Sequence, residues 1–397
     1  MRGMRRGFVV LALLAGCGLV PGQARAVGAP QPGVCNDGVL PGGALSRICV
    51  PASGWNGDLV VWGHGYTAYN QPLGFQNLSV NGVYLPDLVQ KLGYAFATTS
   101  YRRNGLAILE GVDDVRQLVA AFRATNGTPG HTFMVGASEG GIITALLIER
   151  SPELFSGGLA ACGPIGNFRA QLDYWGDFRV LFDYFFPGLV PGDATSVPQE
   201  VIDDWQTLYV PKVTAALQAN PSALTQLIRV SRAPVDAADP TTTAVSTTLD
   251  IMWYNVFATN DGVQELHGVP YSNIGRWYSG SDNDVRLNLL VRRVHADPAT
   301  LATVPRYQTS GRLTLPLVTL HTTGDDIIPY WHEPLYAAKA QPTGAGHLTG
   351  LPVASYGHCN FTLPQLLGSF AILVLQSTGQ DVDLSAVLRA GQAAPVR

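Results

Sequence analysis

The stretch Thr132–Gly141, which reads Thr-Phe-Met-Val-Gly-Ala-Ser-Glu-Gly-Gly, decides the fold. Its first residues form an apolar run typical of a buried strand, and the residues after it have a helical pattern. Between them, Gly136–Gly140 matches the pattern G-x-S-x-G, in which a serine occupies a tight turn from strand to helix. The pattern predicts Ser138 as a nucleophile. The alternative is a glycine-rich turn that carries a solvated serine.

A serine hydroxyl becomes a useful nucleophile only when a base takes its proton and a carboxylate orients that base. Candidates for both follow in the chain. Residues 315–321 read as a buried strand, and Asp325 and Asp326 come just after it. Residues 351–356 read as a short strand that precedes His358. The sequence therefore predicts His358 as the base and one of the two aspartates as the acid.

The other seven histidines are weaker candidates for the base. His321 and His332 flank the two aspartates, so each is either a structural histidine or, with Asp325 and Asp326, part of a metal site. No His-x-x-x-His pattern or cysteine cluster accompanies them, so we expect no metal. Of the remaining five, His64 and His131 precede Ser138, and His267 and His295 fall inside a long insertion. His347 precedes the strand before His358.

Acyl transfer also needs two N–H donors aimed at the developing oxyanion. Residues 58–62 read as a strand that opens into Gly63-His64-Gly65-Tyr66. With this motif, the Ser138 turn, the aspartate loop and His358, the chain resembles the α/β-hydrolase superfamily. The resemblance implies the amides of Tyr66 and Glu139 as the donors, with Gly65 as the alternative to Tyr66. It also selects Asp325 as the acid, which leaves Asp326 to start the following helix, expected near residues 330–340.

The resemblance implies an α/β-hydrolase fold, a mostly parallel central sheet flanked by helices. About 150 residues separate the strand ending near residue 161 from the strand beginning near residue 315, which is far longer than an ordinary connection. We therefore expect a mainly helical cap over residues 165–312. It would divide the core into a first part, residues 27–164, and a second part, residues 313–397.

The expected cap is rich in aromatic residues, most of which must form its own core. Tyr184, Phe185 and Phe186 are candidates for lining an apolar acyl or aryl pocket over Ser138.

The first 26 residues predict an export signal, because a basic start and a short apolar run precede Ala24-Arg25-Ala26. Cleavage there would leave a soluble protein that begins at Val27. A lipobox-like stretch ending at Cys17 would instead leave a lipidated N-terminus. Pro21-Gly22 favours the first reading. We expect a secreted or periplasmic protein without a membrane span, and a lipoprotein anchored through Cys17 is the alternative.

Four cysteines remain after either cleavage, and an even number in an oxidising compartment favours two disulfides. The preferred pairing is Cys35 with Cys49, which closes a local loop, and Cys162 with Cys359, since the fold places both at the carboxyl edge of the sheet. Two buried thiols are the alternative to that second bridge. His358-Cys359 is similar to a motif of tannase and feruloyl esterase relatives, but Ala137 breaks the partner motif beside the serine, which argues against a tannase.

The net charge of −4 would become −8 on loss of residues 1–26 and their four arginines, so nothing basic attracts nucleic acid. No cofactor is implied, because side chains supply the chemistry.

The sequence thus predicts an exported serine hydrolase that cleaves carboxylic esters, with aromatic or polymeric esters as candidate substrates. A peptidase of the same fold is the alternative, and a non-catalytic binding module is a third hypothesis. An acidic cluster facing Ser138 would favour the peptidase, whereas an apolar slot would favour the esterase.

Overall fold

A computed structural model describes residues 30–384. The expected export signal, with both cleavage readings and Cys17, lies outside the described residues. Among the described residues, no helix is both long enough and apolar enough to cross a membrane.

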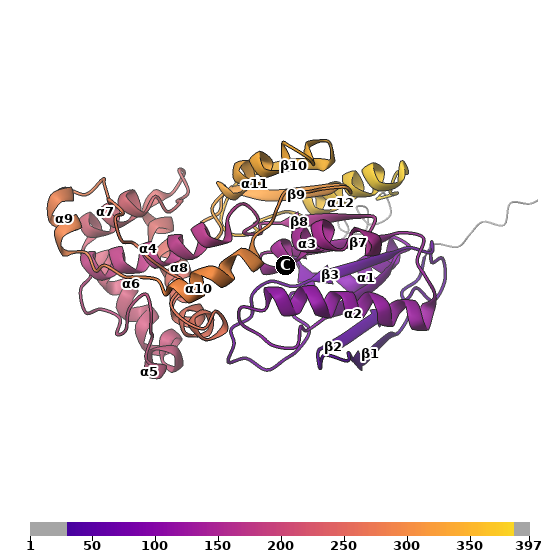
Figure 1. The fold of residues 1–397 in the computed structure, drawn as a ribbon, viewed down its shortest axis with the longest axis horizontal. Coiled ribbons are helices and arrows are strands. Elements are labelled where there is room, and N and C mark those ends of the chain that lie inside the picture. Colours follow the sequence, from indigo (N-terminus) through magenta and orange to yellow (C-terminus); the bar gives the residue numbers. More distant parts are fainter. Residues whose placement is uncertain (1–29, 385–397) are drawn as a thin grey trace, which may run out of the picture.

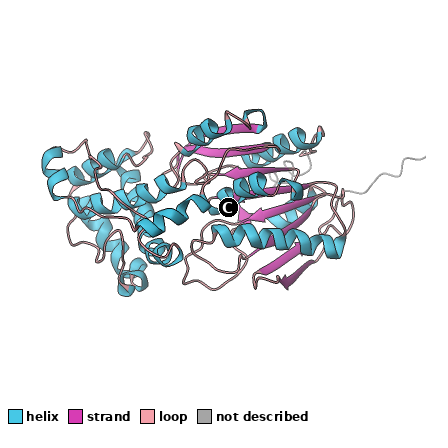
Figure 2. Ribbon diagram, in the orientation of Figure 1, coloured by secondary structure: helices cyan, strands magenta, loops and turns pink. Residues whose placement is uncertain are grey.

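One eight-stranded sheet forms the centre of the molecule, with the order β1-β2-β6-β3-β7-β8-β9-β10 (Figure 2). β2 runs antiparallel to both of its neighbours, and all other neighbouring pairs are parallel. The strands are β1 (Cys35–Val39), β2 (Leu45–Cys49), β3 (Leu59–Gly63), β6 (Ala95–Thr99), β7 (Thr132–Ala137), β8 (Gly157–Ala161), β9 (Leu317–Gly324) and β10 (Leu348–Tyr356). A small hairpin, β4 (Ser79–Val80) and β5 (Val83–Tyr84), lies outside the sheet.

Helices cover both faces of the sheet because its central strands bury alternate side chains on opposite sides. Leu59 and Val61 of β3 belong to one hydrophobic cluster, whereas Val60 and Trp62 belong to another. The first cluster packs against α2, α3 and α11, and the second against α1 and α12 (Figure 1). These elements are α1 (Leu85–Lys91), α2 (Ile108–Asn126), α3 (Glu139–Arg150), α11 (His332–Ala340) and α12 (Leu363–Thr378), with short 3₁₀ helices η1 (Pro152–Leu154) and η4 (Ala345–His347). This is the α/β-hydrolase fold that the sequence predicted.

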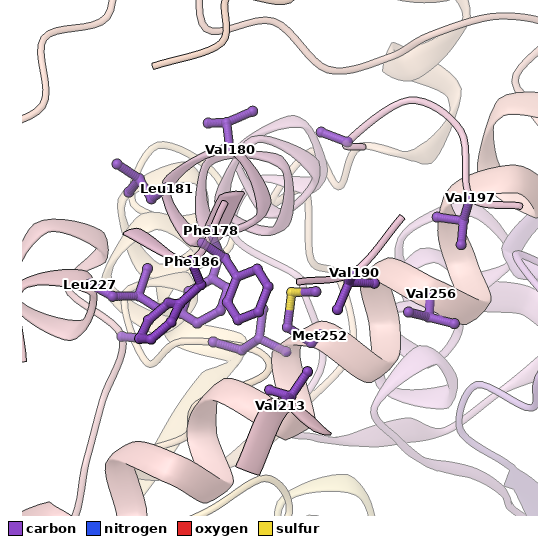
Figure 3. Close-up of a cluster of buried hydrophobic side chains, with 14 of the residues drawn as sticks. Phe178, Val180, Leu181, Phe186, Val190, Val197, Val213, Leu227, Met252 and Val256 are labelled. Carbon is purple, nitrogen blue, oxygen red and sulfur yellow. The ribbon is translucent and has the colours of Figure 1, made fainter. Parts of the chain in front are cut away.

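Residues 162–316, here called the insertion, connect β8 to β9 and lie to one side of the sheet (Figure 1). The insertion contains α4 (Phe168–Phe185), α5 (Gln199–Asp203), η2 (Trp205–Tyr209), α6 (Val210–Ala219), α7 (Pro221–Ser231), α8 (Pro240–Glu265), α9 (Asp284–Leu290), α10 (Pro298–Thr303) and η3 (Val304–Tyr307). Figure 3 shows part of its own hydrophobic core, where Phe178 of α4 lies beside Met252 of α8.

Contacts between α8 and the loops that follow β3 and β6 hold the insertion against the central sheet. Arg103, on the loop after β6, forms ion pairs with Asp261 and Glu265 of α8. The hydroxyl of Tyr66 donates a hydrogen bond to the carbonyl oxygen of Phe257 at 2.9 Å. Both contacts bring α8 across the carboxyl ends of β3 and β6.

Candidate active site

Ser138 occupies the turn between β7 and α3 with φ of 58° and ψ of −118°, a strained conformation for a residue with a side chain. The turn is tight enough to require glycine on both sides of the serine. A Cβ at Gly136 would collide with the carbonyl of Gly140, and a Cβ at Gly140 would collide with the carbonyl of Gly63. The fold therefore holds the Ser138 hydroxyl at the carboxyl edge of the sheet.

The structure brings Ser138, His358 and Asp325 into one chain of hydrogen bonds. His358 Nε2 lies 2.9 Å from Ser138 Oγ, and His358 Nδ1 lies 2.8 Å from Asp325 Oδ2. Asp325 follows β9 and His358 follows β10, so neighbouring parallel strands place them side by side. The three residues that the sequence singled out from distant parts of the chain therefore meet at one point.

The carboxylate of Asp325 is fully buried and heavily hydrogen-bonded. Its Oδ1 accepts from the N–H groups of Ile327 at 3.0 Å and Ile328 at 2.8 Å. Burial alone would raise the pKa of Asp325, but His358 and His321 beside it outweigh burial and hold that pKa well below its usual range. Asp325 is thus an anion that faces His358 over the whole physiological pH range.

Asp326 points away from this chain of hydrogen bonds. Its Oδ2 lies 3.5 Å from the hydroxyl of Tyr356, and its carboxyl contacts that of Asp250 on α8. Burial, together with Asp250 and Asp325, raises the pKa of Asp326 to about 7. The expectation that Asp326 starts the next helix is wrong: α11 begins only at His332, because a turn held by the Asp325 carboxylate and Pro329 intervenes.

Two backbone segments lie next to Ser138, namely Glu139, which follows it in the chain, and the stretch at Gly65. Glu139 is the first residue of α3, so its N–H has no intrahelical acceptor. The backbone of Gly65 passes close to the serine, since a Cβ there would lie 3.2 Å from Ser138 Cβ. The Gly65 N–H donates to Asn77 Oδ1 at 3.3 Å, whereas the Tyr66 N–H has no acceptor among residues 30–384. Tyr66, rather than Gly65, therefore has an available donor.

Both disulfides have the preferred pairing. Cys35 and Cys49 lie opposite each other on β1 and β2, and the Cα atoms of Cys162 and Cys359 are 5.4 Å apart. The second bridge joins the end of β8 to the loop that carries His358. Within the described residues, those two cysteines and His358 form the one cluster of potential metal ligands, but both sulfur atoms are already in the disulfide.

An apolar cavity of about 100 Å³ lies between the central sheet and the insertion and reaches Ser138. Its walls include Leu106, Ile108, Phe168, Trp175, Tyr254 and Ile328. The rings of Trp175 on α4 and Tyr254 on α8 are stacked, with centroids 5.1 Å apart. The sequence showed these two rings only as cap aromatics, because no local pattern reveals that α4 and α8 bring them together.

The residues proposed for the pocket, Tyr184, Phe185 and Phe186, do not line this cavity. They lie at the end of α4, beyond the part of the helix that faces Ser138. Phe186 is buried in the core of the insertion (Figure 3), and the other two pack against that core. The N-terminal half of α4 lines the cavity, whereas the prediction named residues at its C-terminal end.

Glu139 also lines the cavity. Its Oε1 accepts a 2.8 Å hydrogen bond from the N–H of Ala107. Burial raises the pKa of Glu139 to about 8, and that hydrogen bond opposes the shift only in part. At pH 7 this carboxyl is therefore mostly neutral.

A second and more open space, here called the open cleft, has a volume of about 660 Å³. It shares Tyr66, Ser138 and Tyr254 with the apolar cavity. Its other walls include His358, Asn77, Ser79, Asn81 and Asn360.

No protein-family model and no curated protein matches the chain. Among solved structures, an esterase of Pyrococcus furiosus aligns over 88% of this chain and 92% of its own, with 11% identity and a TM-score of 0.45. Lipase A of Candida antarctica aligns over 88% and 82%, with 11% identity and a TM-score of 0.45. An acylaminoacyl peptidase of Pyrococcus horikoshii aligns over 90% of this chain but 44% of its own, with 12% identity and a TM-score of 0.42. These similarities are too low to bear on the reaction, which is inferred from the site itself.

Proposed function

We propose that this protein is a serine hydrolase that cleaves carboxylic esters through a covalent acyl-enzyme. The observation that carries the proposal is the chain of hydrogen bonds from Ser138 through His358 to the buried Asp325, at 2.9 and 2.8 Å. In this geometry His358 Nε2 accepts the serine proton while Asp325 holds Nδ1–H, which is the tautomer that the reaction needs.

The reaction then proceeds in two balanced halves. Ser138 Oγ bonds to the ester carbon, and His358 returns the proton to the leaving alcohol as the C–O bond breaks. Water repeats the attack on the acyl-enzyme, and His358 moves its proton to Ser138. In each half the amides of Tyr66 and Glu139 stabilise the oxyanion, and one such donor is typically worth about 10²–10³ in rate.

The apolar cavity favours esters over peptides with a free amino terminus. Binding the ammonium group of a peptide requires a fixed negative charge. Among the described residues that line the apolar cavity, Glu139 is the one with a carboxyl group. Glu139 is mostly neutral at pH 7. The carboxyls of Asp250 and Asp326 line neither the apolar cavity nor the open cleft.

A matched substrate panel tests this proposal. p-Nitrophenyl esters and aminoacyl or dipeptidyl p-nitroanilides are offered to the purified protein and to its Ser138→Ala variant. Fast, serine-dependent ester cleavage with inert anilides is expected. Efficient anilide cleavage would assign the protein to the peptidases, because amides need the leaving amine to be protonated in place. If the protein is inactive on the whole panel and a serine-directed phosphonate does not label it, the result would favour the hypothesis of a non-catalytic binding module.

We propose further that the protein is exported. Two disulfides support this, since such bonds persist in oxidising compartments. The mass of the mature N-terminus tests it: a chain that begins at Val27 is expected, and a lipidated Cys17 would indicate the anchored form instead. An intact N-terminus starting at Met1 would contradict export.

A further inference from the structure

The apolar cavity and the open cleft meet at Ser138, but they differ in which other reactive groups they contain. His358 lines the open cleft and not the apolar cavity. Glu139 and the stacked Trp175 line the apolar cavity and not the open cleft. A substrate bonded to Ser138 therefore has two different spaces for its two halves.

The position of His358 decides which half goes where. As the general acid, His358 must lie within hydrogen-bond reach of the leaving oxygen. The alcohol half must therefore occupy the open cleft, and the acyl half extends to the other side of Ser138. We propose, given the esterase activity proposed above, that the apolar cavity binds a hydrophobic acyl group and that the open cleft receives the alcohol.

Gly262 marks the position that controls the length of this acyl group. It lies in α8 and lines the apolar cavity. A Cβ built there meets no atom within 4 Å, so a side chain at this position would grow into empty space. Glycine is a poorer helix former than alanine or leucine, so its replacement is not expected to impair folding.

The test compares Gly262→Leu with Gln264→Leu, which adds the same side chain to an exposed position two residues further along α8. Both variants and the wild type are assayed on p-nitrophenyl esters of increasing acyl length. Each methylene group that enters an apolar site contributes about 0.8 kcal/mol, or roughly fourfold in affinity. In Gly262→Leu we expect kcat/KM for the shortest ester to stay within about twofold while long-chain esters lose at least about tenfold. Gln264→Leu should keep the wild-type profile.

The outcomes separate this inference from the proposed function. An unchanged chain-length profile in Gly262→Leu, or an equal loss at every length, would overturn the acyl assignment while leaving Ser138-dependent ester hydrolysis intact. Absence of that hydrolysis in the wild type would instead refute the proposed function. Enlarging the alcohol at a fixed short acyl length should change the rate equally in the wild type and in Gly262→Leu, because the alcohol occupies the open cleft.

A different observation concerns His321, a fully buried residue of β9. Both of its ring nitrogens face oxygen atoms. Nδ1 lies 3.0 Å from Glu333 Oε1, and Nε2 lies 2.8 Å from the carbonyl oxygen of Ile328 and 3.4 Å from Asp325 Oδ2. A neutral imidazole has only one N–H, so this environment fits the doubly protonated cation.

His332, which is equally buried, has the opposite environment. Its Nδ1 accepts from the N–H of Gly166 at 3.0 Å, and its Nε2 faces Gln171 Oε1 at 2.8 Å. One acceptor and one donor fit a neutral ring. Burial lowers the pKa of both histidines, but Asp325 and Glu333 overcome burial at His321 and raise its pKa to about 10, whereas the pKa of His332 is lowered well below its usual value.

We infer that His321 is a cationic positioning residue that holds the Asp325 carboxylate toward His358 and offsets part of its negative charge. The groups around His321 are consistent with this role. Glu333 of α11 balances its charge, the ring of Tyr330 meets it edge-on at 5.8 Å, and His332 is the nearby titratable group that stays neutral. The inference rests on the proposed mechanism, because it concerns the basicity of His358.

The pH dependence of kcat/KM in His321→Gln tests this role, with His332→Gln as the matched control. Without the cation, Asp325 acts on His358 with its full charge and favours the protonated ring. The acidic limb should therefore move upward by about one pH unit in His321→Gln and stay in place in His332→Gln. A reduced kcat with an unmoved limb would show a merely structural role.

A measurement on the wild type keeps the inference testable if His321→Gln does not fold. In ¹⁵N NMR of histidine-labelled protein at pH 8, His321 should show two protonated ring nitrogens. One unprotonated nitrogen at that pH would overturn the inference whether or not the protein is an esterase.

Discussion

The sheet and the insertion contribute to the candidate site in different ways. Ser138, Asp325 and His358 each follow a strand, and the carboxyl ends of parallel strands meet at one edge. The walls of the apolar cavity come largely from the insertion, where tertiary packing alone decides which side chains face Ser138. The sheet thus places the reactive groups in one geometry, whereas the insertion decides what reaches them.

This difference predicts that changes at the sheet edge abolish the chemistry, and the largest effect is expected at Ser138. Ser138→Ala should lower kcat by roughly a million-fold, because loss of a serine nucleophile leaves only binding and oxyanion stabilisation. Its thermal unfolding should match the wild type, since the change removes one partly exposed hydroxyl. Retained turnover of a short p-nitrophenyl ester would refute the assignment of the nucleophile.

The two adjacent aspartates sharpen the comparison within one loop. Asp325→Asn should lower kcat by about 10⁴-fold, because an amide favours the wrong tautomer of the histidine. Asp326→Asn should change kcat by less than about fivefold, since its carboxyl faces Asp250 and Tyr356 rather than His358. Steady-state kinetics of both variants decides this, and similar losses would contradict the choice of Asp325.

The two disulfides allow a comparison of a bond far from the candidate site, between β1 and β2, with a bond next to His358. Cys162 and Cys359 are 197 residues apart, and a chain-entropy argument gives their bond about 5 kcal/mol of stabilisation. Cys35 and Cys49 are 14 residues apart, which corresponds to about 3 kcal/mol. Replacing either pair by alanine should lower the free energy of unfolding in denaturant by up to these amounts.

Only the pair at the site should also affect catalysis. Loss of the bond between Cys162 and Cys359 frees the loop that carries His358, so kcat should fall by about tenfold or more, because small displacements of catalytic groups are costly. Loss of the bond between Cys35 and Cys49 should leave kcat unchanged. Equal activity in both double variants would show that the His358 loop is held without its disulfide.

The residues that the sequence predicted for the sheet edge lie together in the structure, and each lies beside a local sequence signal. Gly136 and Gly140 are required by the turn around Ser138. The resemblance to the α/β-hydrolase superfamily indicated which aspartate is the acid and which histidine is the base. The insertion has no comparable signature: Tyr184 and Trp175 are aromatic residues of one helix, and only contact with α8 distinguishes them. The role of Asp326 was misjudged for the same reason, since its partner Asp250 is distant in sequence.

That pair of carboxyls, one from each region, gives the smallest predicted effect. The pKa of Asp326 is raised from 3.8 to about 7 in the folded protein, first by burial and then by Asp250. A carboxyl with a raised pKa binds its proton more tightly when folded, so the protein should lose stability as the pH rises from about 4 to 7. Each unit of pKa shift corresponds to about 1.4 kcal/mol.

Asp326→Asn removes this titration while keeping the shape of the side chain. Relative to the wild type, the variant should therefore gain stability at pH 8 compared with pH 5, by at least about 1.4 kcal/mol in denaturant unfolding. Asp250→Asn should give a smaller change of the same sign, because it relieves the repulsion at Asp326 but not the burial. A difference that is independent of pH would mean that Asp326 is already ionised in the folded protein at pH 5.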